Sequence, residues 1–438
     1  MLDLSEKKVR LNMIMGVVYK GLSMIISFLY VPVVLLYLGE VKYGIWTTIL
    51  NILSWITHFD IGIGNGLRNK LSESLMENQD KNRTKCLVSS AYIMLTGVVL
   101  LVIIVGCTAA CFVDWNGLLG VGQFDENLRL IMQISIICVG VNFVLSLCKS
   151  IYYSLLENST VGLMGVVQQG LMLLGVLVLK KFKSPSILIV ALLYGLTDFT
   201  VSIFYSLLLF KRNKSFIPSF RYYSKTEARE TTSLGIMFFI AQMASLVLFS
   251  TDNLIISHFI GPAEVTCYSI VNKLFTVGTA MFTMLVVPYW SRTTAAKACG
   301  DYKMIQRSIY TMYKLLGLGV LGSFTLMILF KPIAKIWLRQ ELDYPAGIIA
   351  LMAIYAIVYM WNTIYSQITN GLSLMKVLVP IAIIQGVVNI PLSIFFMLWC
   401  NMGVNGVLLG TILSMMISAV VIPVYVHKEL RSHIAYKR

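Results

Sequence analysis

Charged residues are scarce in this sequence. Only 13% of its 438 residues are Asp, Glu, Lys or Arg, and 58% are hydrophobic, whereas soluble domains carry about 25% charged residues. This composition excludes an ordinary soluble domain and predicts a protein embedded in a lipid bilayer. The net charge of +15 is therefore explained by where Lys and Arg lie relative to the membrane, and no nucleic-acid partner is expected.

Clustered cysteines and large polar loops are also missing. The eight cysteines occur singly, and the sequence contains no Cys-x-x-Cys pair and no Cys/His cluster, so no metal site is predicted. The longest loop expected on the outer side covers residues 114–127, which leaves no room for an extramembrane domain with a large active site. We therefore do not expect an enzyme, and no cofactor is predicted.

Long apolar runs dominate the rest of the chain. A run of about 20 apolar residues is long enough to cross a bilayer as a helix, and we identify twelve of them. The fold class predicted is an all-α polytopic membrane protein with twelve transmembrane helices. The predicted spans are 11–37, 43–67, 86–113, 128–148, 159–180, 186–210, 231–259, 265–290, 308–330, 346–370, 377–399 and 404–426.

The basic residues favour one orientation of these spans. If the N-terminus is cytoplasmic, 24 of the 35 Lys and Arg fall on the cytoplasmic side and eight fall in outer loops. The remaining three, Lys20, Lys273 and Lys314, lie inside spans. Because cytoplasmic loops carry an excess of Lys and Arg, we expect a multi-pass protein with both termini in the cytoplasm.

The longest polar segment, 211–230, lies between the sixth and seventh spans and contains six Lys or Arg. It divides the chain into a six-helix half at 1–210, a basic cytoplasmic linker at 211–230 and a second six-helix half at 231–438. Because six is even, the two halves have the same orientation, and a substrate site is expected where they meet. Internal similarity between the halves is weak but visible, with a short outer turn at Gly39 or Gly261.

Two Lys and Asp combinations lie within spans. Lys20 and Asp60 are each about 10–14 Å deep from the same side of the membrane, so the two side chains can pair. Asp252 and Lys273 repeat the combination in the second half. One interpretation is a structural salt bridge, or a lysine that extends to the nearer interface. The other is that the lysines line a cavity and attract an anion such as phosphate or carboxylate.

Asp198 lies near the middle of the sixth span, beside Tyr194, and has no obvious positive partner at its depth. A buried carboxylate without a partner binds a proton more readily. Asp198 is therefore a candidate proton carrier in ion-coupled transport, with a protonated or water-bridged structural Asp as the alternative.

Two segments resemble a known family. Gly39-Glu-Val-Lys-Tyr-Gly-Ile-Trp46, followed by Asp60-Ile-Gly-Ile-Gly-Asn-Gly-Leu-Arg68, resembles the N-terminal signature of the Wzx-type O-antigen flippases, which are polysaccharide exporters. Asp252-Asn-Leu-Ile-Ile-Ser-His-Phe-Ile-Gly261, with Tyr268 after it, resembles the start of the second half of these proteins.

The resemblance implies a fold and a function. The family belongs, with the MATE drug exporters, to the MOP superfamily, which implies two six-helix bundles in a V shape that alternate access. The implied substrate is an undecaprenyl-pyrophosphate-linked oligosaccharide, moved from the cytoplasmic to the periplasmic leaflet of the bacterial inner membrane, with H⁺ or Na⁺ as candidate coupling ions. A cationic cavity for the pyrophosphate agrees with Lys20 and Lys273. A polysaccharide polymerase and a chain-length regulator are candidate partners.

Three alternatives stay open. A cation-coupled drug exporter would favour acidic cavity residues over lysines. A lipid II flippase resembles this chain but carries fourteen spans. A membrane glycosyltransferase or O-antigen polymerase would need a sizeable outer loop or a carboxylate-rich metal site, whereas the outer loops hold scattered acids such as Asp114, Asp125, Glu126, Glu341 and Asp343.

Overall fold

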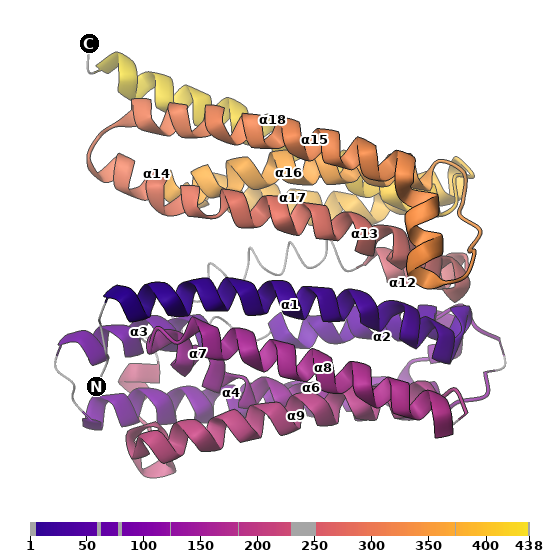
Figure 1. The fold of residues 1–438 in the computed structure, drawn as a ribbon, viewed down its shortest axis with the longest axis horizontal. Helices are drawn as coiled ribbons and strands as arrows, with labels where there is room; N and C mark the ends of the chain where they lie inside the picture. Colours follow the sequence, from indigo (N-terminus) through magenta and orange to yellow (C-terminus); the bar gives the residue numbers. More distant parts are fainter. Residues whose placement is uncertain are drawn as a thin grey trace. The chain divides into compact units, whose positions relative to one another are not determined.

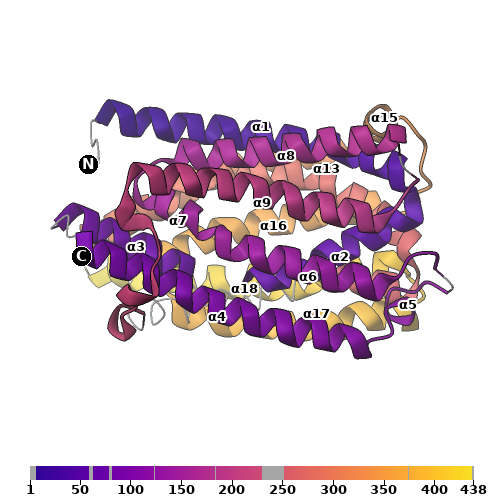
Figure 2. The same ribbon diagram turned by 90° about the horizontal axis from the view of Figure 1, so that it is seen from below.

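The structure is a computed structural model that describes residues 6–58, 63–77, 81–122, 124–182, 184–228, 251–372 and 374–436. Every regular element within these ranges is a helix (Figures 1 and 2). The contacts divide the chain into two compact units, Met1–Ile240 and Ala241–Arg438. The first is called unit 1 and the second unit 2.

Unit 1 contains nine α-helices and two short 3₁₀ helices among its described residues. They are α1 (Glu6–Leu38), α2 (Glu40–His58), α3 (Ile63–Glu77), α4 (Lys81–Phe112), α5 (Trp115–Leu118), α6 (Leu128–Leu145), α7 (Leu147–Ser154), α8 (Asn158–Phe182), α9 (Ile187–Arg212), η1 (Lys214–Phe216) and η2 (Phe220–Tyr222).

Unit 2 is also helical in its described part. Its elements are α12 (Asp252–Phe259), α13 (Pro262–Val286), α14 (Pro288–Ala298), α15 (Tyr302–Leu338), α16 (Ile348–Leu372), α17 (Met375–Ile394), the π-helical turn η3 (Phe395–Trp399) and α18 (Val404–Tyr436).

Ten helices in the described part of the chain are long and apolar enough to cross a membrane. They coincide with ten of the twelve predicted spans, which confirms a polytopic all-α membrane protein. Some helices are much longer than a span needs. The 37 residues of α15 extend about 55 Å, against about 30 Å of bilayer hydrocarbon.

The second and seventh predicted spans are not among the ten. The second, 43–67, contains most of α2, which ends at His58 and has Glu40 and Lys42 in its first turn. Residues 59–62 of this span lie outside the described residues, and the next helix, α3, is much more polar in composition. The seventh span, 231–259, falls mostly outside the described residues, and α12 is its last part.

Helix α1 packs mainly along α8, and the two helices run side by side in both views (Figures 1 and 2). Glycines make the close approach possible: a Cβ placed on Gly162 would lie 2.9 Å from Tyr19 Cβ and 3.1 Å from the carbonyl oxygen of Gly16. Small residues at the contact let two membrane helices pack closely where lipid supplies no hydrophobic driving force between helices.

The two similar turns found in the sequence have similar backbones. Gly39, between α1 and α2, has φ +78°, and Gly261, between α12 and α13, has φ +131°. Both values lie where a residue with a side chain is strained. The repeated glycines thus mark the same helix, tight turn and helix arrangement in each unit.

Residues 211–228 of the predicted basic linker belong to unit 1 and pack against its helices. Phe216 is buried in the core formed by α3, α4, α7 and α9. The backbone N–H groups of Ser219 and Ser224 donate to the hydroxyl groups of Ser89 and Ser90, at 3.1 and 2.9 Å. Within residues 211–228, the linker is therefore held along α4.

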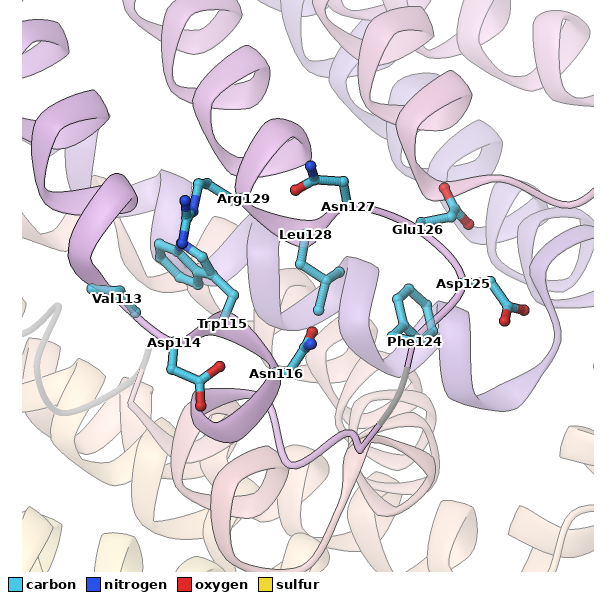
Figure 3. Close-up of a pocket in the computed structure, with 10 residues that line it drawn as sticks. All are labelled: Val113, Asp114, Trp115, Asn116, Phe124, Asp125, Glu126, Asn127, Leu128 and Arg129. Carbon is cyan, nitrogen blue, oxygen red and sulfur yellow. The ribbon is translucent and has the colours of Figure 1, made fainter.

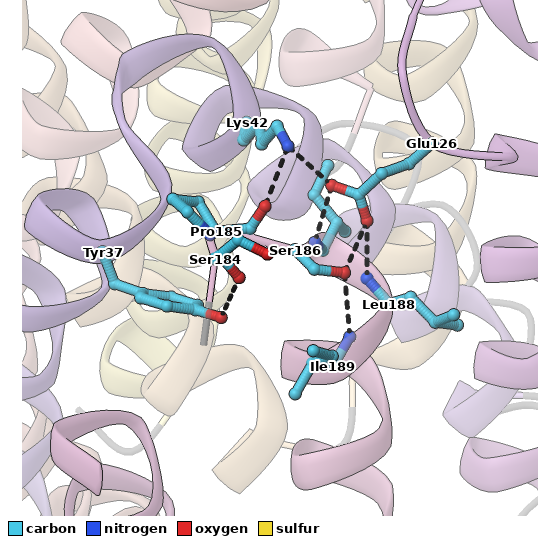
Figure 4. Close-up of polar contacts among 9 residues, drawn as sticks. Tyr37, Lys42, Glu126, Ser184, Pro185, Ser186, Leu188 and Ile189 are labelled. Atoms are coloured by element: carbon cyan, nitrogen blue, oxygen red, sulfur yellow. Dashed lines mark hydrogen bonds and ion pairs between the residues drawn. The ribbon is translucent and has the colours of Figure 1, made fainter. Parts of the chain in front are cut away.

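A partly buried carboxylate, that of Glu126, anchors the start of α9. The carboxylate of Glu126 accepts hydrogen bonds from Ser186 Oγ at 2.8 Å and from the backbone N–H groups of Ile187 and Leu188 at 3.1 Å each (Figure 4). It also pairs with Lys42 Nζ at 2.9 Å, and Lys42 Nζ donates to the carbonyl oxygen of Pro185 as well. The first N–H groups of a helix lack intrahelical partners and attract negative charge.

This arrangement joins α2, α9 and the loop that precedes α6. Burial alone would raise the pKa of the Glu126 carboxyl, but the hydrogen bonds from Lys42, Ser186 and the two backbone N–H groups outweigh burial. The pKa therefore lies below its ordinary value of 4.5. Folding therefore favours the ionised carboxylate of Glu126. The stability that this carboxylate contributes is present above about pH 4.5 and is lost as the pH falls below that value.

We predict that Glu126→Gln lowers the free energy of unfolding by about 1–2 kcal/mol at neutral pH, because it removes the charge that holds Lys42 and the start of α9. The difference between wild type and variant should be lost as the pH falls below about 4.5, where the wild-type carboxylate takes up a proton. Thermal melting of purified protein from about pH 7 to about pH 3 measures both effects. The exposed neighbour Asp125, changed to Asn, is the control. Equal melting of wild type and Glu126→Gln at every pH would contradict the interpretation.

Candidate functional site

The most buried carboxylate described in unit 2 is Asp252, the first residue of α12, which is only 3% exposed. Its Oδ2 accepts a hydrogen bond from the hydroxyl of Tyr268 on α13 at 2.7 Å. The hydroxyl of Thr411 on α18 lies 3.1 Å from Oδ1 and 3.2 Å from Oδ2. Three helices therefore meet at this carboxylate.

The hydrogen bonds continue from Asp252 to α17. The side-chain amide of Asn389 donates to Thr411 Oγ1 at 2.9 Å, and Thr251 Oγ1 donates to Asn389 Oδ1 at 3.4 Å. Asn389 and Thr411 are almost completely buried. The amide thus orients the Thr411 hydroxyl toward the carboxylate.

Further polar side chains join α17 to α18 at a position farther along the two helices from Asp252. Gln385 Nε2 donates to Ser418 Oγ at 2.7 Å and to the carbonyl oxygen of Ser414 at 3.1 Å. On α17, residues 385, 389 and 393 are spaced by four and share one helix face. We call the side chains of Asp252, Asn389, Thr411, Gln385 and Ser418 the polar ladder of unit 2.

The chemistry of the Asp252 end follows from its neighbours. Its hydrogen-bond partners are uncharged oxygen groups, and carboxylate, hydroxyl and amide oxygens are the ligands that hard cations prefer. A carboxylate in this setting can take up a proton or a small cation and lose its charge. An isolated charge is costly inside a bilayer. The local structure favoured when a proton or cation is bound to Asp252 therefore differs from the one favoured when the carboxylate is charged and empty.

Asp252 and Lys273 were predicted to lie at matched depths and to be able to pair, but the structure gives Asp252 other partners. Lys273 is partly buried on α13, five residues after Tyr268. Five residues correspond to a rotation of about 140° around a helix. Because Tyr268 faces the carboxylate, Lys273 points in another direction, and the partners that the structure gives Asp252 are Tyr268 and Thr411.

The prediction that Asp198 has no positive partner is wrong. Lys149 Nζ lies 3.8 Å from Asp198 Oδ1, and both side chains are mostly buried. Lys149 belongs to α7, which continues from α6 after a break at Ser146, so the lysine that we assigned to the cytoplasmic side reaches the sixth predicted span. At 3.8 Å the contact is an ion pair without a hydrogen bond, and Asp198 Oδ1 is buried with no hydrogen-bond partner.

Lys20 is an exposed residue of α1. No acidic side chain in the described ranges forms an ion pair with it. Asp60, its predicted partner, lies outside the described residues.

The direction of Lys20 follows from the helix period. Val18, Leu22, Ile25 and Leu29 form an exposed apolar stripe along α1, which is the face suited to lipid. At about 100° per residue, Lys20 projects roughly opposite to that stripe. Its ammonium group is therefore exposed on the side of α1 that is turned away from the apolar stripe.

A pocket of about 520 Å³ lies where α4 ends and α6 begins. Its lining includes Asp114, Asp125, Glu126 and Arg129 (Figure 3). Asp114 and Asp125 lie on opposite sides of the pocket in this view, and the Glu126 carboxylate is held at the start of α9. Among the described residues, no group of three His, Cys, Asp or Glu side chains is placed to hold a metal ion.

The fold is similar to that of solved transporters. An inward-facing MATE family multidrug resistance transporter of the MOP superfamily superposes with a TM-score of 0.77 at 12% identity, covering 96% of this chain and 99% of that one. An outward-facing MATE transporter gives a TM-score of 0.67 at 14% identity, covering 97% and 96%. The protein is thus a multi-pass membrane protein with the MATE fold.

The sequence comparisons define the family. Residues 9–294 match the family described as "Polysaccharide biosynthesis protein", and the chain belongs to this family. It is 22% identical over 417 residues to the "Putative O-antigen transporter" of Salmonella typhimurium, covering 92% of this chain and 90% of the relative. It is 21% identical over 415 residues to the "Putative O-antigen export protein" of Yersinia pseudotuberculosis, covering 90% of each.

These comparisons confirm the resemblance to the Wzx-type polysaccharide exporters, with a MATE-like fold. The relatives are named as transporters, in agreement with the prediction that this protein is not an enzyme.

Several polar residues that the structure brings together were not predicted from the sequence. Asn389, Thr411, Gln385 and Ser418 were not singled out, although polar side chains at a spacing of four inside an apolar span are a visible signal. Lys149 was assigned to a loop because the break at Ser146 falls where the span was expected to end.

We predict that Lys149 and Asp198 are energetically coupled. Lys149→Met leaves a mostly buried carboxylate without its cation, and Asp198→Asn leaves the ammonium without its anion, so each change should lower stability. The double variant should lose less than the sum of the single losses, by about 0.5–2 kcal/mol. Thermal melting of the four proteins measures this difference. Additivity within about 0.3 kcal/mol would mean that the pair contributes nothing.

Proposed function

We propose that this protein is a flippase that moves an undecaprenyl-pyrophosphate-linked oligosaccharide, a repeat unit of O-antigen or a similar surface polysaccharide, from the cytoplasmic to the periplasmic leaflet. The observation that carries the proposal is the similarity of nearly the whole chain to O-antigen transporters, with family membership over residues 9–294. Alternating access of two halves is the mechanism that the MATE fold supports.

In this proposal the chain has twelve spans in two six-helix halves. The second span includes α2, and the seventh ends in α12. Both termini are cytoplasmic in the bacterial inner membrane, as the distribution of Lys and Arg favours. A polysaccharide polymerase and a chain-length regulator are the proposed partners.

Lys20 and Lys273 are the proposed contacts for the pyrophosphate. A compact ammonium group in a site of low dielectric constant attracts phosphate strongly. The exposed position of Lys20, opposite the apolar stripe of α1, supports this role. The positive charges of the two lysines would balance the negative charges of the pyrophosphate in an otherwise apolar path. Asp60 and Asp198 are proposed to lie along the same path.

Asp252 is the proposed site for the coupling ion, H⁺ or Na⁺. Its carboxylate is buried among hydroxyl groups from α13 and α18. Loss of the bound ion restores a buried negative charge, which needs either new hydrogen bonds or access to water. Ion binding at Asp252 would thereby favour one conformation of the transporter over the other.

Deletion of the gene in its host tests the proposal. Surface glycan should disappear while lipid-linked repeat units accumulate on the cytoplasmic leaflet. Persisting surface glycan with reduced drug efflux would instead favour a drug exporter. Repeat units that reach the periplasm without being polymerised would favour a polymerase.

We predict that the double variant Lys20→Ala, Lys273→Ala reduces flipping at least tenfold, because it removes both proposed phosphate contacts. Complementation of the deleted strain, with the membrane level of each variant measured, reports the effect. Lys314→Ala is the matched control, since Lys314 also lies in a span but its ammonium group rests 5.1 Å from the centre of the Tyr310 ring. Normal flipping by the stably inserted double variant would contradict the assignment.

We predict that Asp252→Asn abolishes the dependence of flipping on an ion gradient. An Asn oxygen can still accept from Tyr268 and Thr411, so the local packing should persist, but the amide has no negative charge to take up a proton or to balance a bound cation. Flipping in vesicles with an imposed pH or Na⁺ gradient measures the effect. Thr411→Ser, which keeps the hydroxyl, should retain coupling, and Thr411→Val should weaken it. Gradient dependence that survives in Asp252→Asn would exclude this site.

A further inference from the structure

Unit 2 contains a cavity that the proposed lysine and aspartate sites do not use. It has a volume of about 280 Å³ and lies among α13, α16, α17 and α18. Gln385, one of its lining residues, is ten residues from the start of α17, or about 15 Å along the helix. That is about half of the bilayer hydrocarbon thickness, so the cavity lies at the depth that an interior path crosses.

The lining of this cavity is polar but uncharged. Thr283, Asn362, Thr363, Ser366, Gln367 and Ser418 contribute hydroxyl or amide groups. The lining residues in the described part of the chain include no Asp, Glu, Lys or Arg. Leu378, Ile381 and Ile422 supply apolar surface. The cavity therefore has hydrogen-bonding groups together with an apolar wall, and it offers nothing that selects an ion by charge.

One lining group lacks a hydrogen-bond partner. Gln367 is only 8% exposed, and its Oε1 is buried without a donor. A buried amide oxygen without a donor loses the free energy of a missing hydrogen bond. Gln367 lines the cavity, so a ligand hydroxyl there would supply that donor once the side-chain amide turns toward it.

The other amides are fixed by α18. Gln385 donates to Ser418 Oγ and to the carbonyl oxygen of Ser414, and Asn362 donates to the carbonyl oxygen of Met415 at 3.1 Å. These contacts hold both side chains in place before any ligand enters. A preformed set of polar groups binds a ligand with a smaller loss of side-chain entropy.

We propose that this cavity binds one neutral sugar ring of the lipid-linked oligosaccharide. A pyranose presents hydroxyl groups at its edge and C–H groups on its faces, which matches the amide, hydroxyl and apolar parts of the lining. The volume of about 280 Å³ is just below the range of about 300–1,000 Å³ for sites that hold drug-sized molecules, so it suits a single ring. This inference rests on the proposed flippase function and adds to it a separation of roles: the lysines hold the pyrophosphate, and unit 2 holds a sugar.

The test uses purified full-length protein and a probe that carries no lipid and no phosphate. The probe is a radiolabelled single-repeat oligosaccharide, released by mild acid from the host's own lipid-linked intermediate. Equilibrium dialysis should show saturable binding to wild type, and inorganic pyrophosphate should not displace the oligosaccharide. Gln367→Leu, which removes the unpartnered oxygen at nearly constant volume, should weaken binding about tenfold.

Two further variants keep the result interpretable. Thr363→Val removes another lining hydroxyl and should also weaken binding, even if Gln367→Leu proves unstable. Gln169→Leu makes the same chemical change in α8 of unit 1 and should leave binding unchanged. Thermal melting of each variant shows whether it is folded.

The outcomes separate this inference from the proposed function. Absence of saturable binding to wild type, or equal binding by folded Gln367→Leu and Thr363→Val, would overturn the sugar site and leave a cavity filled only by water. Displacement of the oligosaccharide by pyrophosphate would also overturn it, since the two groups would then share one site. Flipping of the lipid-linked substrate by wild type in vesicles is measured separately, and its failure would count against the flippase while the dialysis still decides whether the cavity binds sugar.

Discussion

A polar group inside a membrane protein must find its hydrogen-bond partners within the protein, because the surrounding hydrocarbon offers none. The polar ladder of unit 2 satisfies this requirement with side chains from several helices. Asp252, at the start of α12, depends on Tyr268 from α13 and Thr411 from α18. Each helix is thereby held in register with its neighbours, and a shift of any of them would leave a carboxylate unsatisfied.

The described parts of the two units meet this requirement differently. In unit 1, partly buried acids are paired with cations: Glu126 with Lys42, and Asp198 with Lys149. In unit 2, the partners of Asp252 are neutral. A carboxylate among hydroxyl groups has no fixed cation to neutralise it, so a bound proton or small cation can take that place. This difference is why Asp252 is the proposed position of a switch driven by an ion.

The proposed ion site and the proposed sugar cavity share the same two helices. Gln385 lies one turn from Asn389 on α17, and Ser418 lies two turns from Thr411 on α18. A movement of α17 along α18 would therefore alter both sites together. Such a shared element is what coupling between an ion and a substrate requires, since each ligand must favour the same conformation.

The sequence predicted the spans well because each span is set by local hydropathy, which needs no knowledge of packing. Contacts between helices were harder to predict. Asp252 and Thr411 are 159 residues apart, and only the packing of α12 on α18 brings them together. The spacing of 385, 389 and 393 shows that one face of α17 is polar, but it does not identify α18 as the partner. Lys149 was misplaced because a single break, at Ser146, decides whether α7 belongs to a loop or to the membrane.

Reconstitution of the purified protein is the most direct test of the central claim. Vesicles that contain only this protein and a fluorescent undecaprenyl-pyrophosphate-linked oligosaccharide would be treated from outside with an impermeant reagent that destroys the sugar label. A flippase brings labelled lipid from the inner leaflet to the reagent, so nearly all of the label should be lost. Protein-free vesicles should keep about half. If vesicles with the protein also kept half of the label, under every imposed ion gradient, the account of this chain as a lipid-linked oligosaccharide flippase would be wrong.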